Sequence, residues 1–303
     1  SYAGGLGDSV NSNGNGQESS SEAMQSWGGV YLLGVALGDR ELRDAGIFGW
    51  ITESNGTAEY WFDRDHIYDG RECNYDYSKY KHPYCTNLTS KGIGWWTWFS
   101  GDAVWMHSIQ WMPVSPCLNY LSRDLTFAKW DYDRMMSATE YDWFETRGES
   151  DALSNQSLGN VVLCYLERSN PDEAARIFDQ AYDDNRPMAR GIDTGHISYY
   201  TIHSHRGLGD IDWEVYADTP TATAYRHSDG SMSYVVYNNP DVVHERTVNF
   251  YRNGALEKSV RVPAGEGMTT FTADPVATSV RIVSSKGDIV APGASTVLTA
   301  TVL

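Results

Sequence analysis

The sequence has few cysteines and no long apolar run. Only four of the 303 residues are cysteine, and their spacing fits no zinc site. Cys73 and Cys85 flank a Tyr- and Asp-rich loop that a disulfide could close in an oxidising compartment, whereas Cys117 and Cys164 have the setting of core thiols. No apolar stretch is long enough to cross a bilayer, so we expect no membrane-spanning segment. We expect Ser1 to lie inside a domain rather than at a secretion leader.

Basic residues are also scarce, which limits the partners that the protein can bind. Lysine and arginine together number 23, against 40 aspartate and glutamate residues, and the formal net charge is −17. Such a surface repels nucleic acid, anionic membranes and acidic polysaccharides, so a neutral polymer is the natural partner. Solubility is the simpler explanation of the same charge, because net charge keeps a protein in solution.

Aromatic residues, by contrast, are abundant, with 11 Trp and 20 Tyr. From Tyr60 to Gly94 neither helical nor strand periodicity is visible, and Tyr, Trp, Asp and His dominate. A loop this long inside a domain is usually functional, and flat rings beside polar groups suit a sugar-binding surface. His66 lies beside Asp63 and Asp65, but no further ligand follows at a suitable spacing, so we expect neither a metal nor a cofactor.

A loop rich in Gly and Asn runs directly into a helix pattern near the start of the chain, with the sequence NGNGQESSSEAMQSW over residues 13–27. Glu18 and Glu22 are four residues apart, so on a helix they share one face, with Cβ atoms roughly 5–6 Å apart. The free N–H groups and dipole of a helix N-terminus can compensate the two charges. A solvated acidic helix start is the simplest interpretation. However, the serines are poor helix formers and Trp27 follows at once, which indicates that this end abuts packed residues.

The run QESSSEA at residues 17–23 resembles the signature of the family 81 glycoside hydrolases, which are endo-acting β-1,3-glucanases. SYAGGL at residues 1–6 is similar to the family's preceding segment. TWF at 97–99, MHSIQ at 106–110 and MPVSP at 112–116 are similar to a second set of family segments, in the same order. The resemblance implies that Glu18 is the general base that activates water and that Glu22 is its close active-site partner.

The resemblance further implies an inverting endo-hydrolase of laminarin- or curdlan-type β-1,3-glucans that is secreted or cell-surface. An inverting enzyme needs two carboxyl groups roughly 6.5–9.5 Å apart across the scissile bond. Glu18 and Glu22 share one helix face and cannot straddle a sugar, so they are base and helper. In the family, the general acid is an Asp upstream of this motif, outside this chain. The missing N-terminal part of the same enzyme is therefore an expected partner. The alternative is a non-catalytic β-glucan-binding or cell-surface module.

Six side chains are candidates for binding the glucan, because they could supply stacking rings or a polar edge. Some of the rings are expected to belong to the core, and a satisfied, half-buried histidine is the alternative for the imidazole. The six candidates are Tyr60, Trp61, Trp95, Trp96, Trp98 and His107.

Helical spacing dominates residues 1–210, which we interpret, with the resemblance, as the C-terminal part of an (α/α)6 catalytic barrel. The first expected helix, Met24–Leu37, is apolar nearly all round and should be buried, with glycines that admit close neighbours. Glu41–Ile51 should complete a helical hairpin. Later helices are expected over 103–111, 130–145 and 153–167, from Pro171, and over 194–209. In the last of these, His203 and His205 show no acidic partner at a telling spacing, so helix-end charge complementarity is expected.

The pattern changes to strand alternation around Ile211. Residues 211–274 should form an antiparallel β region, with Asn253-Gly254 as a hairpin turn. Residues 275–303 resemble the opening strands of a bacterial immunoglobulin-like domain or a linker. The predicted fold class is therefore mainly α, followed by a small antiparallel sheet or sandwich. The expected strands are 221–225, 232–237, 246–251, 256–262 and 269–271.

Overall fold

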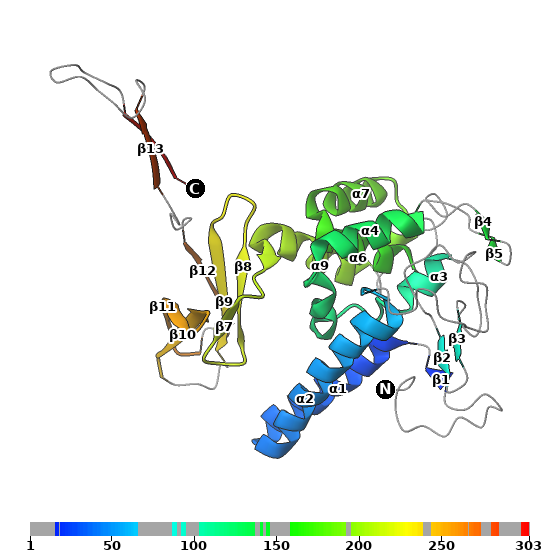
Figure 1. Cartoon of the computed structure of the whole chain (residues 1–303), viewed down its shortest axis with the longest axis horizontal. Coiled ribbons are helices and arrows are strands. Elements are labelled where there is room, and N and C mark those ends of the chain that lie inside the picture. Colours follow the sequence, from blue (N-terminus) through cyan, green and yellow to red (C-terminus); the bar gives the residue numbers. More distant parts are fainter. Residues whose placement is uncertain are drawn as a thin grey trace. The chain divides into compact units, whose positions relative to one another are not determined.

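The chain divides into two compact units, Ser1–Gly207 and Leu208–Leu303, and each is described here by itself. The first unit is mainly helical and the second is built of antiparallel strands (Figure 1). Among the described residues, no helix is both long and apolar enough to cross a membrane. The computed structural model describes residues 16–17, 19–65, 87–89, 92–94, 103–136, 140–141, 144–145, 158–191, 195–238, 244–265, 267–273, 280–284 and 298–302.

Two long helices, α1 (Ser20–Leu37) and α2 (Arg40–Gly56), form the predicted hairpin (Figure 1). Gly38 ends α1 in the left-handed region, with φ of 68°, which a residue without Cβ adopts freely. Asp39 then caps α2, because its side chain accepts a hydrogen bond from the Leu42 N–H at 3.1 Å. The chain continues from α2 into a π-helical turn, η1 (Thr57–Trp61).

The two helices of the hairpin lie in near-backbone contact. A Cβ added to Gly34 would lie 2.3 Å from the backbone nitrogen of Arg43, and one added to Gly46 would lie 2.4 Å from that of Tyr31. Any larger residue at either position would push the helices apart. The prediction that the glycines of the first helix admit a close neighbour is therefore confirmed at Gly34, but not at Gly29 or Gly38, where no atom of the described residues lies within 4 Å of an added Cβ.

The hairpin is nevertheless not buried on all sides, and that part of the prediction was wrong. Leu37 is 67% exposed and Phe48 is 73% exposed. The physical reason is that α1 and α2 cover each other on one side only, so their outer faces stay open in the described part of the chain. We call this exposed set the apolar wall, and its members are Leu32, Leu33, Val35, Leu37, Ile47, Phe48 and Ile51.

The rest of the helical unit surrounds α6 (Gly159–Ser169), all of whose residues except Ser169 are buried. Tyr165 of α6 stacks on Trp111, with ring centroids 3.7 Å apart and an angle of 5° between the planes. The other elements are α3 (Ala103–Ser108), the 3-10 helix η2 (Pro116–Ser122), α4 (Leu125–Met136), α7 (Pro171–Asp183), α8 (Pro187–Arg190) and α9 (Gly195–Leu208).

Two predictions about this region were wrong. The helix expected over 130–145 ends at Met136, and β4 (Glu140–Tyr141) pairs with β5 (Phe144–Glu145) beyond it. The Ser and Thr residues of 137–139 have side chains that compete with helical hydrogen bonding, which explains an end here. The histidines of α9 do have acidic partners, which come from α6 and α7. His205 Nδ1 lies 2.6 Å from Glu167 Oε1, and His203 Nε2 lies 3.2 Å from Asp179 Oδ1.

The second unit contains two antiparallel sheets, with strand orders β11-β10-β7 and β12-β9-β8-β6. Tyr234 and Val236 from one sheet and Phe250 and Val260 from the other belong to one buried apolar cluster, as in a sandwich. Asn253 and Gly254 have φ of 50° and 81°, as the predicted hairpin turn requires. The strands are β6 (Asp210–Ile211), β7 (Val215–Ala217), β8 (Ala222–Arg226), β9 (Met232–Asn238), β10 (Arg246–Arg252), β11 (Ala255–Val262) and β12 (Gly267–Ala273).

The predicted antiparallel β region is therefore confirmed. Beyond it, β13 (Val280–Ser284) and β14 (Leu298–Val302) pair as an antiparallel ladder. The immunoglobulin-like assignment of residues 275–303 stays a prediction.

Asp212 is the centre of an ion-pair network in the β unit. Its Oδ2 accepts hydrogen bonds from Arg226 and Arg252, both at 2.7 Å, and its side chain is only 5% exposed. Burial raises the pKa of Asp212, but the hydrogen bonds from the arginines lower it more, and the net direction is down. The lowered pKa means that the ionised carboxylate stabilises the folded state.

We expect Asp212→Asn to lower the free energy of unfolding by about 2 kcal/mol at pH 7, less than for a fully buried pair because the arginines keep exposed surface. Because the pKa of Asp212 is lower in the folded than in the unfolded protein, its ionised carboxylate stabilises the folded state at pH values above the unfolded pKa of about 3.9. This stabilisation is lost as the pH falls through the folded-state pKa. In urea unfolding, the difference in unfolding free energy between wild type and Asp212→Asn should therefore be smaller at pH 3 than at pH 7. Glu245→Gln, which breaks the exposed pair with Arg261, is the control, and equal losses in both variants would contradict the prediction.

Candidate active site

The first turn of α1 carries the serine-rich motif, and all three serines are buried. Ser19, Ser20 and Ser21 are 2%, 1% and 0% exposed. Ser19 is the N-cap of α1, since its Oγ accepts a hydrogen bond from the Glu22 N–H at 3.2 Å. An N-cap serine followed three residues later by glutamate has the spacing of a capping box. The poor helix formers therefore stand at the one place in a helix where serine is favoured.

Each of these serines also bonds to the loop that follows α3, which lies about ninety residues away in the sequence. The Ser20 N–H and Oγ both donate to Gln110 Oε1, at 2.8 and 2.6 Å. Ser19 Oγ and Ser21 Oγ lie 3.1 and 2.8 Å from the Ile109 carbonyl oxygen. The three serines of QESSSEA and the Ile109-Gln110 end of MHSIQ thus form one buried polar cluster that fixes the start of α1.

Glu22 lies in this first turn with an exposed side chain. A carboxylate at this position is favoured by the free N–H groups and dipole of the helix N-terminus. Glu18 lies outside the described residues. The backbone next to it on either side is held. β1 (Gly16–Gln17) pairs with β2 (Asn87–Thr89), which pairs with β3 (Gly92–Gly94), and Ser19 caps α1.

Three of the six predicted sugar-binding residues are described, and they differ in exposure. Tyr60 is 55% exposed, whereas its neighbour Trp61 is 4% exposed and packs in the apolar core of the helical unit. His107 is fully buried rather than half-buried, and its Nδ1 lies 2.8 Å from Asp131 Oδ1, which is also fully buried. Of these three, only Tyr60 presents a ring to solvent. The remaining candidates, Trp95, Trp96 and Trp98, lie outside the described residues, as do Cys73 and Cys85.

The described residues provide no group of three or more His, Cys, Asp or Glu side chains that could hold a metal ion. Cys117 and Cys164 are free thiols. Burial raises the pKa of Cys164 to about 12, so this thiol stays protonated and unreactive at neutral pH.

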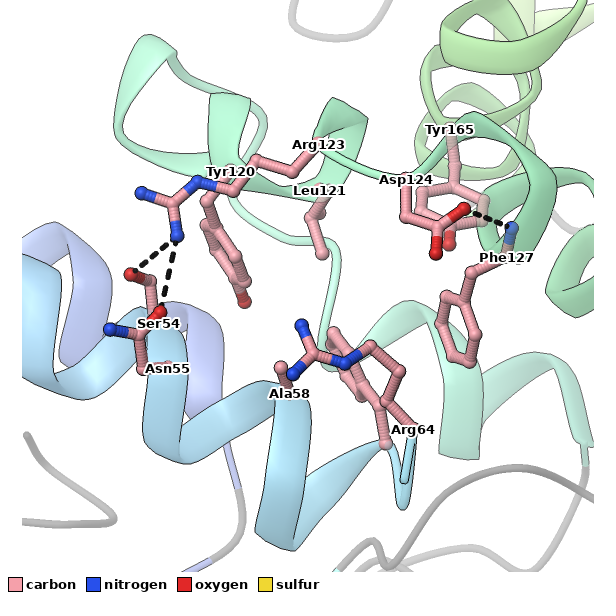
Figure 2. A pocket seen from close by; sticks show the side chains of 11 residues that line it. Ser54, Asn55, Ala58, Arg64, Tyr120, Leu121, Arg123, Asp124, Phe127 and Tyr165 are labelled. Carbon is pink, nitrogen blue, oxygen red and sulfur yellow. Dashed lines mark hydrogen bonds between the residues drawn. The ribbon is translucent and has the colours of Figure 1, made fainter. Parts of the chain in front are cut away.

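A pocket that no sequence motif indicated lies between the end of α2, η1, η2 and the start of α4 (Figure 2). Arg123 reaches Ser54 Oγ at 3.2 Å, while the Asp124 carboxylate accepts from the Phe127 N–H at 2.9 Å. Of the three described sugar-binding candidates, Tyr60, Trp61 and His107, none lines it. The lining residues are Ser54, Asn55, Ala58, Phe62, Arg64, Tyr120, Leu121, Arg123, Asp124, Phe127 and Tyr165.

The segments that build the serine cluster fall within a single family match. A profile described as the glycosyl hydrolase family 81 C-terminal domain matches residues 1–184, which is more than half of the chain. The chain belongs to glycoside hydrolase family 81. The match runs from the start of the chain through the serine-rich turn and the loop after α3 to the end of α7. The predicted family resemblance is confirmed.

Two curated relatives carry the name glucan endo-1,3-beta-D-glucosidase. The protein of Acetivibrio thermocellus is 27% identical over 229 residues, which cover 74% of this chain and 26% of the relative. The protein of Thermobifida fusca is 27% identical over 225 residues, which cover 74% of this chain and 27% of the relative. The chain therefore spans about a quarter of the length of these relatives.

A solved structure shows the same fold. A mutant of the glycoside hydrolase family 81 protein from Clostridium thermocellum superposes with a TM-score of 0.64 at 23% identity. The superposition covers 86% of this chain and 32% of the solved chain. At this level of identity the likeness concerns the fold alone.

Proposed function

We propose that the complete protein hydrolyses internal β-1,3-glucosidic bonds of laminarin- or curdlan-type glucans with inversion. The observation that carries the proposal is the buried serine cluster. It lies within the family 81 match and ties the helix start that carries Glu22 to the loop after α3. Both curated relatives are named as endo-1,3-beta-glucosidases. Because such glucans are polymers, a secreted or cell-surface location is part of the proposal.

In the proposed mechanism, Glu18 is the general base and Glu22 its partner. The base accepts a proton from the water that attacks the anomeric carbon, while an acid on the opposite side protonates the departing oxygen. Glu22 is exposed and stands at a helix N-terminus, where a negative charge is stabilised. The general acid belongs to a part of the protein that these residues do not include. Tyr60, whose ring is exposed, is the described residue best suited to stack on a sugar.

The apolar wall supports a second part of the proposal. Seven large apolar side chains from α1 and α2 are 40% or more exposed, and large exposed apolar surface marks an interaction site. The chain spans about a quarter of the length of its curated relatives. We therefore assign the wall to contact with further helices of the same protein, as in an (α/α)6 barrel.

One experiment tests both parts. The complete gene product and residues 1–303 alone are assayed on laminarin, curdlan and, as a β-1,4-linked control, cellulose. We expect the complete product to release oligosaccharides from the first two only, and residues 1–303 alone to be inactive and to self-associate in native mass spectrometry. A complete product that binds laminarin without cleaving it would favour the non-catalytic binding module. A monomeric, fully soluble fragment would contradict the assignment of the wall.

A further inference from the structure

Gln110 is a fully buried side chain that the proposed mechanism does not yet use. Its Oε1 accepts two hydrogen bonds from Ser20, one from the backbone N–H at 2.8 Å and one from Oγ at 2.6 Å. We propose that Gln110 is a positioning residue that fixes the helix start from which Glu22 projects. This inference rests on the proposed function, because it assigns a role in that same reaction.

The geometry of the helix start makes Gln110 a cap that comes from another segment. Ser20 is the first residue of α1, so its N–H has no acceptor within the helix. Gln110 accepts from that N–H, and the Ser19 hydroxyl accepts from the Glu22 N–H. Two of the free N–H groups of the first turn are thereby satisfied, one from inside the motif and one from outside. The hydrogen bond from Ser20 to Gln110 determines where this first turn lies relative to the rest of the helical unit.

Gln110 is itself held from the core. Its N–H donates to the His107 carbonyl oxygen at 3.0 Å, and the His107 ring is paired with Asp131 of α4 at 2.8 Å. His107, Gln110 and Asp131 are all fully buried. A continuous buried polar chain therefore runs from α4 through the end of α3 to the first turn of α1. Side chains locked by packing and hydrogen bonds can hold a catalytic group within the narrow tolerance that chemistry needs.

The neutral amide is the suitable acceptor at this position. A carboxylate in place of Gln110 would bury a negative charge beside the helix start that carries Glu22, and burying an unpaired charge is costly. An apolar side chain would leave the Ser20 N–H without its acceptor in a buried place. The chain also offers a comparison in Gln25, which lies further along α1. Its Nε2 donates to the Pro113 carbonyl oxygen at 2.9 Å, and its Oε1 accepts from Ser115 Oγ at 2.8 Å.

The test compares Gln110→Met with Gln25→Met in the complete gene product. Methionine keeps the length of the side chain and removes the acceptor. We expect Gln110→Met to lower kcat on laminarin by about 10²-fold, the effect of a displacement of about 1 Å, with KM within about twofold of wild type. Hydrogen exchange at the amides of residues 20–24 should become faster. Gln25→Met breaks a bridge to the same loop but leaves the first-turn bonds, so its kcat should stay within about twofold of wild type.

Ser20→Ala provides a second variant that removes only the Oγ donor, and it should lower kcat by about tenfold even if Gln110→Met fails to fold. Wild-type kcat and unchanged exchange in a folded Gln110→Met or in Ser20→Ala would overturn the inference. Equal losses of kcat in Gln110→Met and Gln25→Met would also overturn it, because they would indicate a purely structural role. If the wild-type protein cleaves no β-1,3-glucan, the proposed function fails, and exchange at residues 20–24 still tests the anchoring.

Discussion

Replacing Glu18 by glutamine in the complete protein is expected to lower kcat on laminarin by about 10²–10⁴-fold, the contribution of proton transfer by a positioned side chain. The amide has nearly the same shape as the carboxylate but cannot accept a proton from the attacking water. Binding of the glucan depends on the rest of the site and should persist. The variant should therefore retard laminarin in affinity electrophoresis as wild type does while releasing almost no reducing sugar.

The neighbouring helix supplies a matched control. Glu41 lies in the first turn of α2 as Glu22 lies in the first turn of α1, and both side chains are exposed. Glu41→Gln should leave kcat within about twofold of wild type, while Glu22→Gln should lower it, because Glu22 is the partner of the base. Full hydrolytic activity in Glu18→Gln would remove Glu18 from the mechanism and with it the proposed assignment.

Elements with strong local signals could be predicted from the sequence. Pro171, followed by two acidic residues, indicated the start of α7, and α7 begins at Pro171. Asn253-Gly254 indicated a hairpin turn, and both residues have the positive φ that such a turn requires. In each case a short stretch of chain decides the conformation by itself, since the fixed φ of proline and the free φ of glycine do not depend on distant residues.

Features that depend on distant contacts could not be predicted. His205 has its acidic partner, Glu167, on a different helix, and no local spacing signals such a pair. Tyr60 and Trp61 are adjacent aromatic residues in one helical turn, yet one is exposed and the other is core, because neighbouring positions on a helix face different directions. Burial of this kind is decided by what packs against each face.

The serine cluster combines a feature that could be predicted from the sequence with one that could not. The motif QESSSEA identified the helix start, and the N-cap at Ser19 agrees with its serine-rich composition. The bond from Ser20 to Gln110 joins segments ninety residues apart. A single sequence does not show which distant segments lie close together in space. Nothing in the segment MHSIQ therefore distinguished Gln110 from an ordinary polar residue.

Replacing both Gly34 and Gly46 by alanine is expected to lower the free energy of unfolding of the helical unit by about 4 kcal/mol, since overpacking costs about 1–3 kcal/mol at each site. A Cβ on Gly34 would meet the Arg43 backbone nitrogen at 2.3 Å, and one on Gly46 would meet the Tyr31 backbone nitrogen at 2.4 Å. Backbone atoms cannot rotate away as a side chain can, so the hairpin has to separate. Urea unfolding followed by tryptophan fluorescence measures the change.

Gly29 provides the control, because it lies inside α1, as Gly34 does, with no atom of the described part of the chain within 4 Å of an added Cβ. Gly29→Ala should stabilise the helix by up to about 1 kcal/mol, since alanine has the higher helix propensity. The two kinds of Gly→Ala change thus differ in sign, and the same propensity gain is present in both. If the variant at Gly34 and Gly46 unfolds at the same urea concentration as Gly29→Ala, α1 and α2 do not pack in near-backbone contact.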